Sequence, residues 1–194
     1  PTSFPDRIGE IWWVALERVI AGNDRIGLYV DGHERRFDVA SADEKKNIYQ
    51  QLYWWLRNLP TEEELRTNIR DLCARYGIDM KALCDELCMS WEDIAELSRD
   101  PLVTIGAHTV NHYMLKKTTE RVARAEMEMS RAVIESAIGI RPNHLAYPVG
   151  DPASAGPREF ALAAELGFKT AVTTQPGVLF RENGKHLTAL PRIS

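Results

Sequence analysis

Residues 106–112, GAHTVNH, decide how the second half of this chain is interpreted. They follow residues 102–105, LVTI, a short apolar run that predicts a buried strand. His108 and His112 would then lie at the carboxyl end of that strand, where α/β folds place their chemistry. A spacing of four residues places two imidazoles on one face of a helical turn, so the motif predicts a site for one divalent ion. The alternative is one helix-capping and one surface histidine.

The pattern after residue 112 alternates between helices and strands. A helix is expected over residues 118–137, ending at Gly139, and a second helix begins at Pro157 and ends at Gly167. Short strands are expected at residues 145–147 and 170–174. This order predicts parallel pairing, so residues 101–194 are interpreted as part of an α/β sheet or barrel.

Residues 1–100 are interpreted as a mainly helical segment with one short hairpin. A helix is predicted over residues 11–20, and strands at 26–30 and 35–39 flank the turn Asp31-Gly32, a type I′ signal. Three more helices are expected from N-terminal capping pairs: Ser41 with Glu44, Thr61 with Glu64, and Ser90 with Asp93. The aromatic cluster at residues 53–55 predicts core packing, with a sugar-stacking surface as the alternative.

Composition excludes several classes of protein. The 194 residues carry a formal charge of −4 and contain no basic run, so nucleic acid is not an expected partner. No apolar stretch is long enough to span a membrane, and no signal peptide is visible. Three cysteines without scaffold spacing indicate reduced, mostly buried thiols.

A non-enzymatic alternative uses two of these cysteines. Cys84 and Cys88 together with His108 and His112 could form a structural Cys2His2 zinc site. Residues 84–112 hold six acidic residues and only one basic residue, which would repel DNA. The chain would in that case be a scaffold or interaction module.

A second motif, residues 145–151, has the sequence LAYPVGD. A strand that ends in Pro-Val-Gly makes a tight turn whose backbone N–H groups can point into a site and stabilise a developing oxyanion. The alternative is an ordinary turn between a strand and a loop.

Together the two motifs resemble those of the NodB-type polysaccharide deacetylases, carbohydrate esterase family four. His108-Thr109-Val110-Asn111-His112 matches the family's metal motif, and residues 145–150 match its Pro-Tyr-Gly turn, with Val149 in the second Tyr position. Residues 167–174 and 190–193 resemble later family segments, so the likeness spans about residues 90–194. It implies an incomplete, distorted (β/α) barrel, with the helical half resembling an insertion that some members carry.

The resemblance also implies a reaction. A divalent ion, usually zinc, would be held by His108, His112 and an aspartate, and a second aspartate would be the base. The backbone of Val149, flanked by Tyr147 and Pro148, would help to stabilise the oxyanion, and Thr109 would orient the metal ligands. The substrate would be an acetylated poly- or oligosaccharide, whose sugar the sequence does not specify.

Three departures from the family pattern define what we expect of this chain. The family's Asp-Asp pair lies upstream of every motif seen here, and its late histidine lies downstream, because His186 is too early and is interpreted as a loop histidine. Ala146 stands where many members carry an arginine that holds the base; Arg192 is the candidate substitute, whereas Arg141 is expected to be a solvated surface residue. The chain is therefore expected to be an inactive fragment of an active parent, with the helical half as a possible homodimer surface.

Overall fold

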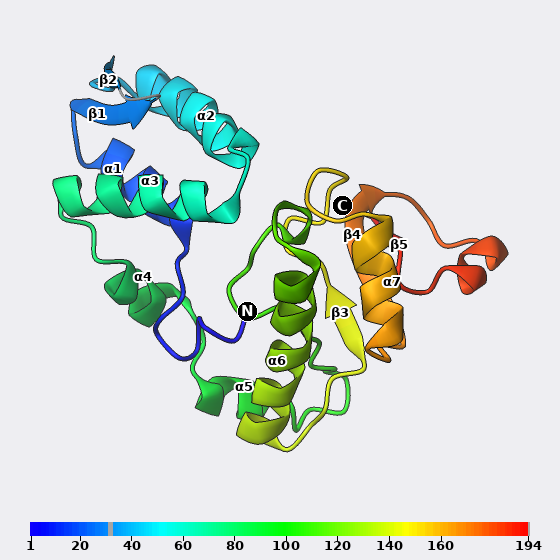
Figure 1. Ribbon diagram of the computed structural model, residues 1–194. Helices are drawn as coiled ribbons and strands as arrows, with labels where there is room; N and C mark the ends of the chain where they lie inside the picture. Colours follow the sequence, from blue (N-terminus) through cyan, green and yellow to red (C-terminus); the bar gives the residue numbers. More distant parts are fainter. Residues whose placement is uncertain (31–32, 194) are drawn as a thin grey trace. The chain divides into compact units, whose positions relative to one another are not determined.

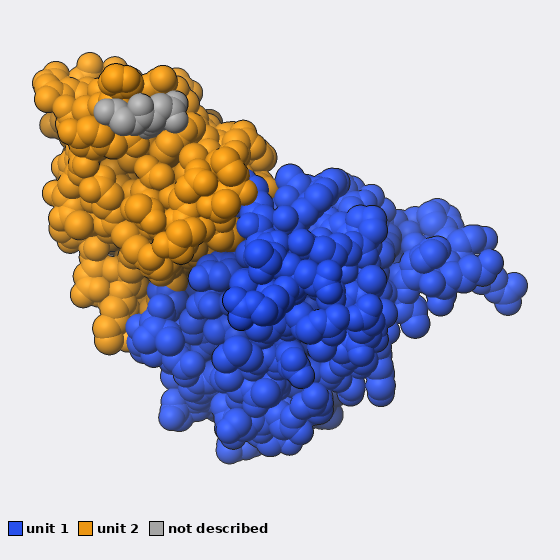
Figure 2. All heavy atoms as spheres, in the orientation of Figure 1, with its two compact units in different colours: residues 1–9, 88–194 blue, residues 10–87 orange. Residues whose placement is uncertain are grey.

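The computed structural model describes residues 1–30 and 33–193, which form two compact units (Figure 2). Unit 1 comprises Pro1–Gly9 and Cys88–Ser194, and unit 2 comprises Glu10–Leu87. The first residues belong to unit 1 because the backbone N–H groups of Thr2 and Ser3 donate to the carbonyls of Thr109 and Val110, at 3.2 and 3.0 Å.

Unit 2 is built around α1 (Trp12–Ala21), whose apolar side packs against α2 (Ala42–Asn58), α3 (Glu62–Tyr76) and α4 (Met80–Leu87) (Figure 1). Its buried side chains recur at helical spacing and are Trp12, Ala15, Leu16, Val19 and Ile20. No helix was predicted over α4. The predicted helix over residues 11–20 is confirmed.

The predicted hairpin is also present in unit 2. β1 (Arg25–Val30) and β2 (His33–Asp38) pair antiparallel, with Ile26 opposite Phe37. The predicted turn residues, Asp31 and Gly32, lie outside the described residues.

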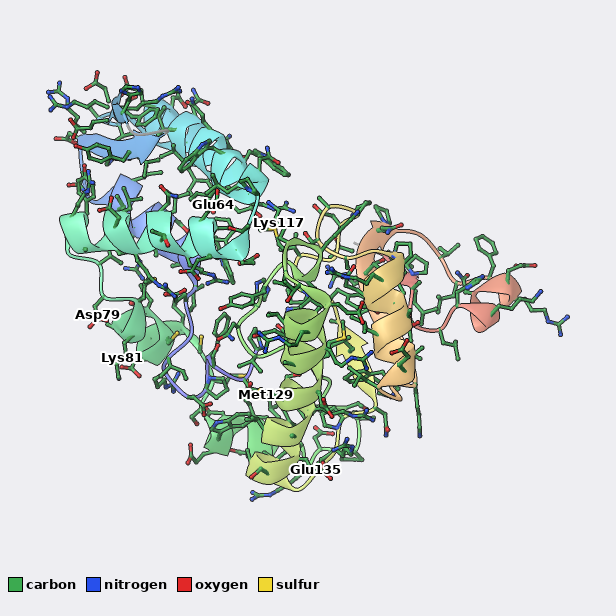
Figure 3. The ribbon with its side chains drawn as sticks, viewed as in Figure 1. Glu64, Asp79, Lys81, Lys117, Met129 and Glu135 are labelled. Atoms are coloured by element: carbon green, nitrogen blue, oxygen red, sulfur yellow. The ribbon has the colours of Figure 1, made fainter. Side chains whose placement is uncertain are left out.

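The N-terminal capping pairs begin their helices as predicted. The Ser41 side chain accepts from the Glu44 N–H, while the Glu44 carboxylate accepts from the Ser41 N–H at 2.8 Å, which completes a capping box. Thr61 accepts in the same way from the N–H of Glu64, which is labelled in Figure 3, at 3.2 Å. These local bonds satisfy N–H groups that have no partner inside the helix.

Unit 1 contains a three-stranded parallel sheet in the order β3–β4–β5. The strands are β3 (His144–Ala146), β4 (Thr170–Pro176) and β5 (Leu190–Arg192), and α7 (Pro157–Glu165) connects the first two. The predicted strand–helix–strand order and its parallel pairing are confirmed. Over the described residues the sheet is open, and no closed barrel is formed.

The core of unit 1 lies between this sheet and its helices. The long helix α6 (Glu120–Ile138) buries Ala123, Met127 and Ile134 against Leu145 of β3 and Leu162 of α7. Its Met129, labelled in Figure 3, is exposed. Across the part of the chain that the structure describes, no helix combines the length and apolar character that crossing a membrane requires.

Residues 102–105 do not form the predicted buried strand. Leu102 is 93% exposed, and its N–H donates to the Asp100 carboxylate in a turn. Only Ala107 joins the sheet, through a parallel bridge to Leu145. A β-branched run becomes a strand only where a partner strand offers hydrogen bonds. In the described residues, pairing between this segment and β3 begins only at Ala107.

Short helices and turns complete unit 1. α5 (Trp91–Leu97) begins at a Ser90–Asp93 capping box and packs against α6, while η1 (Leu115–Lys117) and η2 (Arg181–Lys185) are single 3-10 turns. The predicted third capping pair is thereby confirmed.

Candidate metal centre

The two predicted histidines lie side by side in unit 1. The ring centroids of His108 and His112 are 4.9 Å apart, and the rings are inclined by 75°. Nδ1 of His108 lies 2.7 Å from the carbonyl oxygen of Ala146. Because a carbonyl only accepts, Nδ1 carries the hydrogen, and Nε2 keeps the lone pair that a metal ligand needs. The donor set and ring spacing fit a divalent ion that prefers imidazole nitrogen, as zinc does.

The backbone that carries these rings is not the predicted helical turn. Thr109 and His112 have φ values of 63° and 60°, in the left-handed region that non-glycine residues rarely adopt. The hydroxyl of Thr109 accepts from the His112 N–H at 3.1 Å, and Thr109 is fully buried. The i to i+4 spacing therefore brings the rings together through a tight loop, and the proposed role of Thr109 has a physical basis in this bond.

His108 is held in its neutral form. The pKa of His108 is lowered, first by burial and also by the positive charge of Arg192, while the hydrogen bond to Ala146 acts in the opposite direction. A neutral imidazole is the form that binds a metal. The exposed Arg192 thus lies within electrostatic range of His108, whereas Arg141 pairs on the surface with Glu135, as expected.

The Pro-Val-Gly motif forms a γ-turn centred on Val149. The Gly150 N–H donates to the Pro148 carbonyl at 2.6 Å, and Val149 has a φ of 60°, a rare and strained conformation for a β-branched residue. Thr174 of β4 holds the turn from the other side: its N–H donates to Gly150 O at 3.0 Å, and its hydroxyl donates to Val149 O at 2.7 Å. Among the described residues, no acceptor takes the N–H of Val149.

Tyr147 lies in the core, and this placement does not favour a direct catalytic role for its hydroxyl. The residue is 2% exposed, and its hydroxyl donates to the carbonyl of Thr188 at 2.7 Å. Burial, and then the charge of Glu159, raise the pKa of the Tyr147 phenol well above its usual range. His186 is exposed beside η2, which agrees with its interpretation as a loop histidine.

A buried carboxylate that the sequence interpretation missed supports the histidine loop. Glu126 of α6 is 6% exposed, and its oxygens accept from the N–H of Val110 at 2.9 Å, the N–H of Asn111 at 2.8 Å and the Asn111 side-chain amide at 2.6 Å. A signal was present: Glu126 lies three residues after Ala123 and four before Ser130, on the buried face of an amphipathic helix. A charged residue at such a position needs partners from elsewhere in the chain.

The cysteines do not assemble a second metal site. Cys73 and Cys84 are buried in α3 and α4, and Cys88 is half-buried just after α4. Across residues 1–30 and 33–193, no group of three or more His, Cys, Asp or Glu side chains lies close enough to hold an ion. The Cys2His2 alternative therefore finds no support.

A cavity of about 240 Å³ in unit 1 reaches His108. Gly106, Ile105, Trp91 and Thr2 contribute to its wall, so residues from the N-terminal segment, α5 and the histidine loop meet there.

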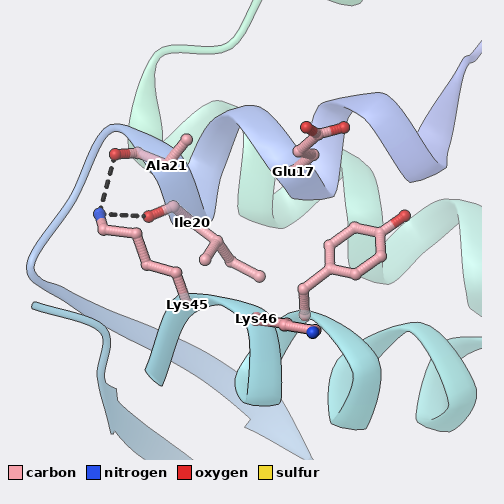
Figure 4. A pocket seen from close by; sticks show the side chains of 6 residues that line it. Glu17, Ile20, Ala21, Lys45 and Lys46 are labelled. Atoms are coloured by element: carbon pink, nitrogen blue, oxygen red, sulfur yellow. Dashed lines mark hydrogen bonds between the residues drawn. The ribbon is translucent and has the colours of Figure 1, made fainter. Parts of the chain in front are cut away.

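Another cavity, of about 390 Å³, lies within unit 2 between α1 and α2 (Figure 4). Its wall includes Glu17, Lys46 and Lys45. The Lys45 ammonium donates to the carbonyls of Ile20 and Ala21 at 2.9 and 2.8 Å, so it caps the C-terminus of α1. This cavity contains no histidine and has no part in the candidate metal centre.

A family model described as polysaccharide deacetylase matches residues 62–171. YxkH of Bacillus subtilis (strain 168), whose name places it among the polysaccharide deacetylases, is 26% identical over 92 residues, which are 47% of this chain and 32% of YxkH. The chain thus spans about a third of the length of that relative.

Solved structures of deacetylases are also similar. The Streptococcus pyogenes deacetylase PplD, in complex with acetate, has a TM-score of 0.49 and 28% identity, covering 54% of this chain and 44% of PplD. The polysaccharide deacetylase BC0361 from Bacillus cereus has a TM-score of 0.48 and 22% identity, covering 54% of this chain and 32% of BC0361.

The family match covers more than half of the chain. It runs from the start of α3, through the histidine loop and the Pro-Val-Gly turn, to the beginning of β4. This chain belongs to the polysaccharide deacetylase family.

Proposed function

We propose that this chain supplies the histidine half of the active site of a metal-dependent hydrolase that removes acetyl groups from N- or O-acetylated sugars of a poly- or oligosaccharide. The observation that carries the proposal is that the ring centroids of His108 and His112 lie 4.9 Å apart, while Nδ1 of His108 is hydrogen-bonded to the carbonyl oxygen of Ala146. That bond orients the ring and directs its free nitrogen away from the carbonyl, as in many metal-binding histidines.

His108 and His112 would hold the ion, and their imidazole nitrogens are donors that suit zinc. A bound divalent ion supplies Lewis-acid polarisation of a carbonyl group. The protein's part is to hold both imidazoles in place, and the burial that lowers the pKa of His108 keeps that ring in its neutral form. Thr109, through its bond to the His112 N–H, would limit the freedom of the second ring.

Val149 would contribute its backbone N–H to the developing oxyanion. The strained γ-turn supports this role, because rare backbone conformations persist where surrounding bonds impose them and are concentrated at functional sites. Pro148 and Gly150 define the turn, and Thr174 braces it from β4. A donor held in advance stabilises charge without reorganisation during the reaction.

The third metal ligand and the base are proposed to be acidic residues outside these 194 residues, as the family resemblance implies. Arg192, whose charge reaches His108, is the candidate to hold the base. Catalytic zinc typically has three protein ligands, and loss of a base costs about 10²–10⁴ in rate. The 194-residue chain alone is therefore expected to be close to inactive.

Acetate release from N-acetylglucosamine oligomers, measured with and without added zinc, tests the proposal. The full-length protein should release acetate only with metal, and His108→Ala should abolish the release, whereas His186→Ala, at an exposed loop position, should not. Full activity of His108→Ala would refute the metal role. Full activity of the 194-residue chain would mean that an acid within it, such as Asp151, completes the site.

A further inference from the structure

Both carboxylate oxygens of Glu126 accept hydrogen bonds from two of the three residues between the histidines, Val110 and Asn111. The three hydrogen bonds are 2.6–2.9 Å long, and all come from Val110 or Asn111. Buried carboxylates are tolerated only where donors satisfy them, and the three donors named here all belong to the loop. The α6 helix and the histidine loop are thereby tied at one point.

Helix stability does not require a carboxylate at this position. Glu126 lies in the second turn of α6, beyond the Thr119 cap, and its buried neighbours on that face include Ala123 and Met127. Replacing a buried charge and its partners with well-packed apolar groups is often neutral or stabilising. A carboxylate here is explained better by what it does to the loop than by what it does to the helix.

The backbone conformation of the histidine loop requires support from outside the loop. Thr109 and His112 both adopt positive φ on either side of the two residues that Glu126 binds. Residues hold such conformations only when the surroundings over-determine them. Without the carboxylate, the N–H groups of Val110 and Asn111 lose the acceptor that fixes this stretch.

We propose that Glu126 is a positioning residue, which sets the conformation of the loop and so the mutual placement of His108 and His112 before a metal ion binds. This inference rests on the proposed function, because the metal is what the placement serves. Glu126 touches neither imidazole in the described hydrogen-bond pattern and acts through Val110 and Asn111.

The test measures zinc affinity by chelator competition, together with thermal unfolding of the metal-free chain. Glu126→Ala should weaken zinc binding by about 10- to 100-fold, the range found for residues that support metal ligands. The matched control is Glu159→Gln: Glu159 is also buried and accepts from the Gly156 N–H at 2.9 Å, but it is not bonded to the histidine loop. The control should leave zinc affinity unchanged.

A swap of partners separates positioning from general destabilisation. In Asn111→Asp two carboxylates face each other, whereas in Glu126→Gln the Asn111 amide can turn and accept from the glutamine. The double variant Glu126→Gln/Asn111→Asp lets the glutamine amide donate to the new aspartate. It should bind zinc more tightly than Asn111→Asp alone. Affinity losses that simply add in the double variant, or an equal loss in Glu159→Gln, would overturn the proposal.

Amide hydrogen exchange tests the role of Glu126 without any metal ion. Exchange at Val110 and Asn111 should accelerate by at least about tenfold in Glu126→Ala while the core of α6 stays protected. If the wild type bound zinc without any need for His108, the proposed function would fail, yet the exchange result would still decide whether Glu126 sets the loop. Unchanged exchange at both amides would refute it.

Discussion

Nδ1 of His108 lies 2.7 Å from the carbonyl oxygen of Ala146, the last residue of β3. This bond joins the histidine loop to the strand that leads into the Pro-Val-Gly turn, so the two motifs lie next to each other. The Ala107–Leu145 bridge beside it fixes the same register through the backbone.

The bond predicts a single tautomer for His108. Two-dimensional ¹H–¹⁵N spectra that correlate ring nitrogens with ring protons should show Nδ1 protonated and Nε2 bare in the metal-free chain, because the carbonyl can only accept. The exposed His33 has no such constraint and serves as the internal reference. A His108 ring protonated at Nε2 would contradict the orientation described here.

Gly150→Ala should destabilise the chain by more than about 1 kcal/mol. Gly150 has a φ of 70°, and an added Cβ would lie 2.8 Å from the backbone nitrogen of Thr174. Gly139→Ala is the control: its φ of 72° imposes similar backbone strain, but its Cβ would meet nothing within 4 Å. Urea unfolding measures both, and equal losses would mean that contact with Thr174 adds nothing.

Val149→Gly should relieve strain at the centre of the γ-turn and raise or preserve the free energy of unfolding, since positive φ at a β-branched residue costs on the order of 1–3 kcal/mol. Val172→Gly, at a half-buried valine within β4, should instead destabilise the chain. A clear destabilisation by Val149→Gly would show that side-chain packing outweighs the backbone strain.

Burial of the Cys73 thiol predicts a loss of stability in alkali. Burial, and then the charge of Glu10, raise the pKa of Cys73 from 9.0 to about 11. The unfolded chain therefore ionises first, so this contribution is complete below pH 9 and is lost as pH rises towards 11, at no more than about 1.4 kcal/mol per pH unit. Cys73→Ala should flatten the decline between pH 9 and 11. An unchanged slope would mean that other groups cause it.

Features that depend on neighbours in sequence were predictable. The Ser41–Glu44 and Ser90–Asp93 boxes were found because both partners lie within one helical turn. The β3–α7–β4 crossover followed from the alternation of short apolar runs with a helical pattern.

Features that depend on distant residues were not predictable in the same way. Residues 102–105 have strand propensity, yet strand formation needs a partner that propensity does not supply. The loop between the histidines is shaped by Glu126, 15 residues beyond Asn111, and by the Thr109 hydroxyl, so an i to i+4 spacing alone was mistaken for a helical turn. The spacing and the family resemblance drew attention to the histidines and to Thr109, whereas the support from Glu126 was found only in the structure.

The most direct test of the central claim is zinc affinity, measured by chelator competition, for the wild type and for His108→Ala, His112→Ala and His33→Ala. Loss of either proposed ligand should weaken binding by more than the roughly 10- to 100-fold typical of supporting residues. Replacement of His33, which is exposed at the start of β2 in unit 2, should leave zinc affinity unchanged. Equal zinc binding by all four proteins would contradict the metal site and the function proposed from it.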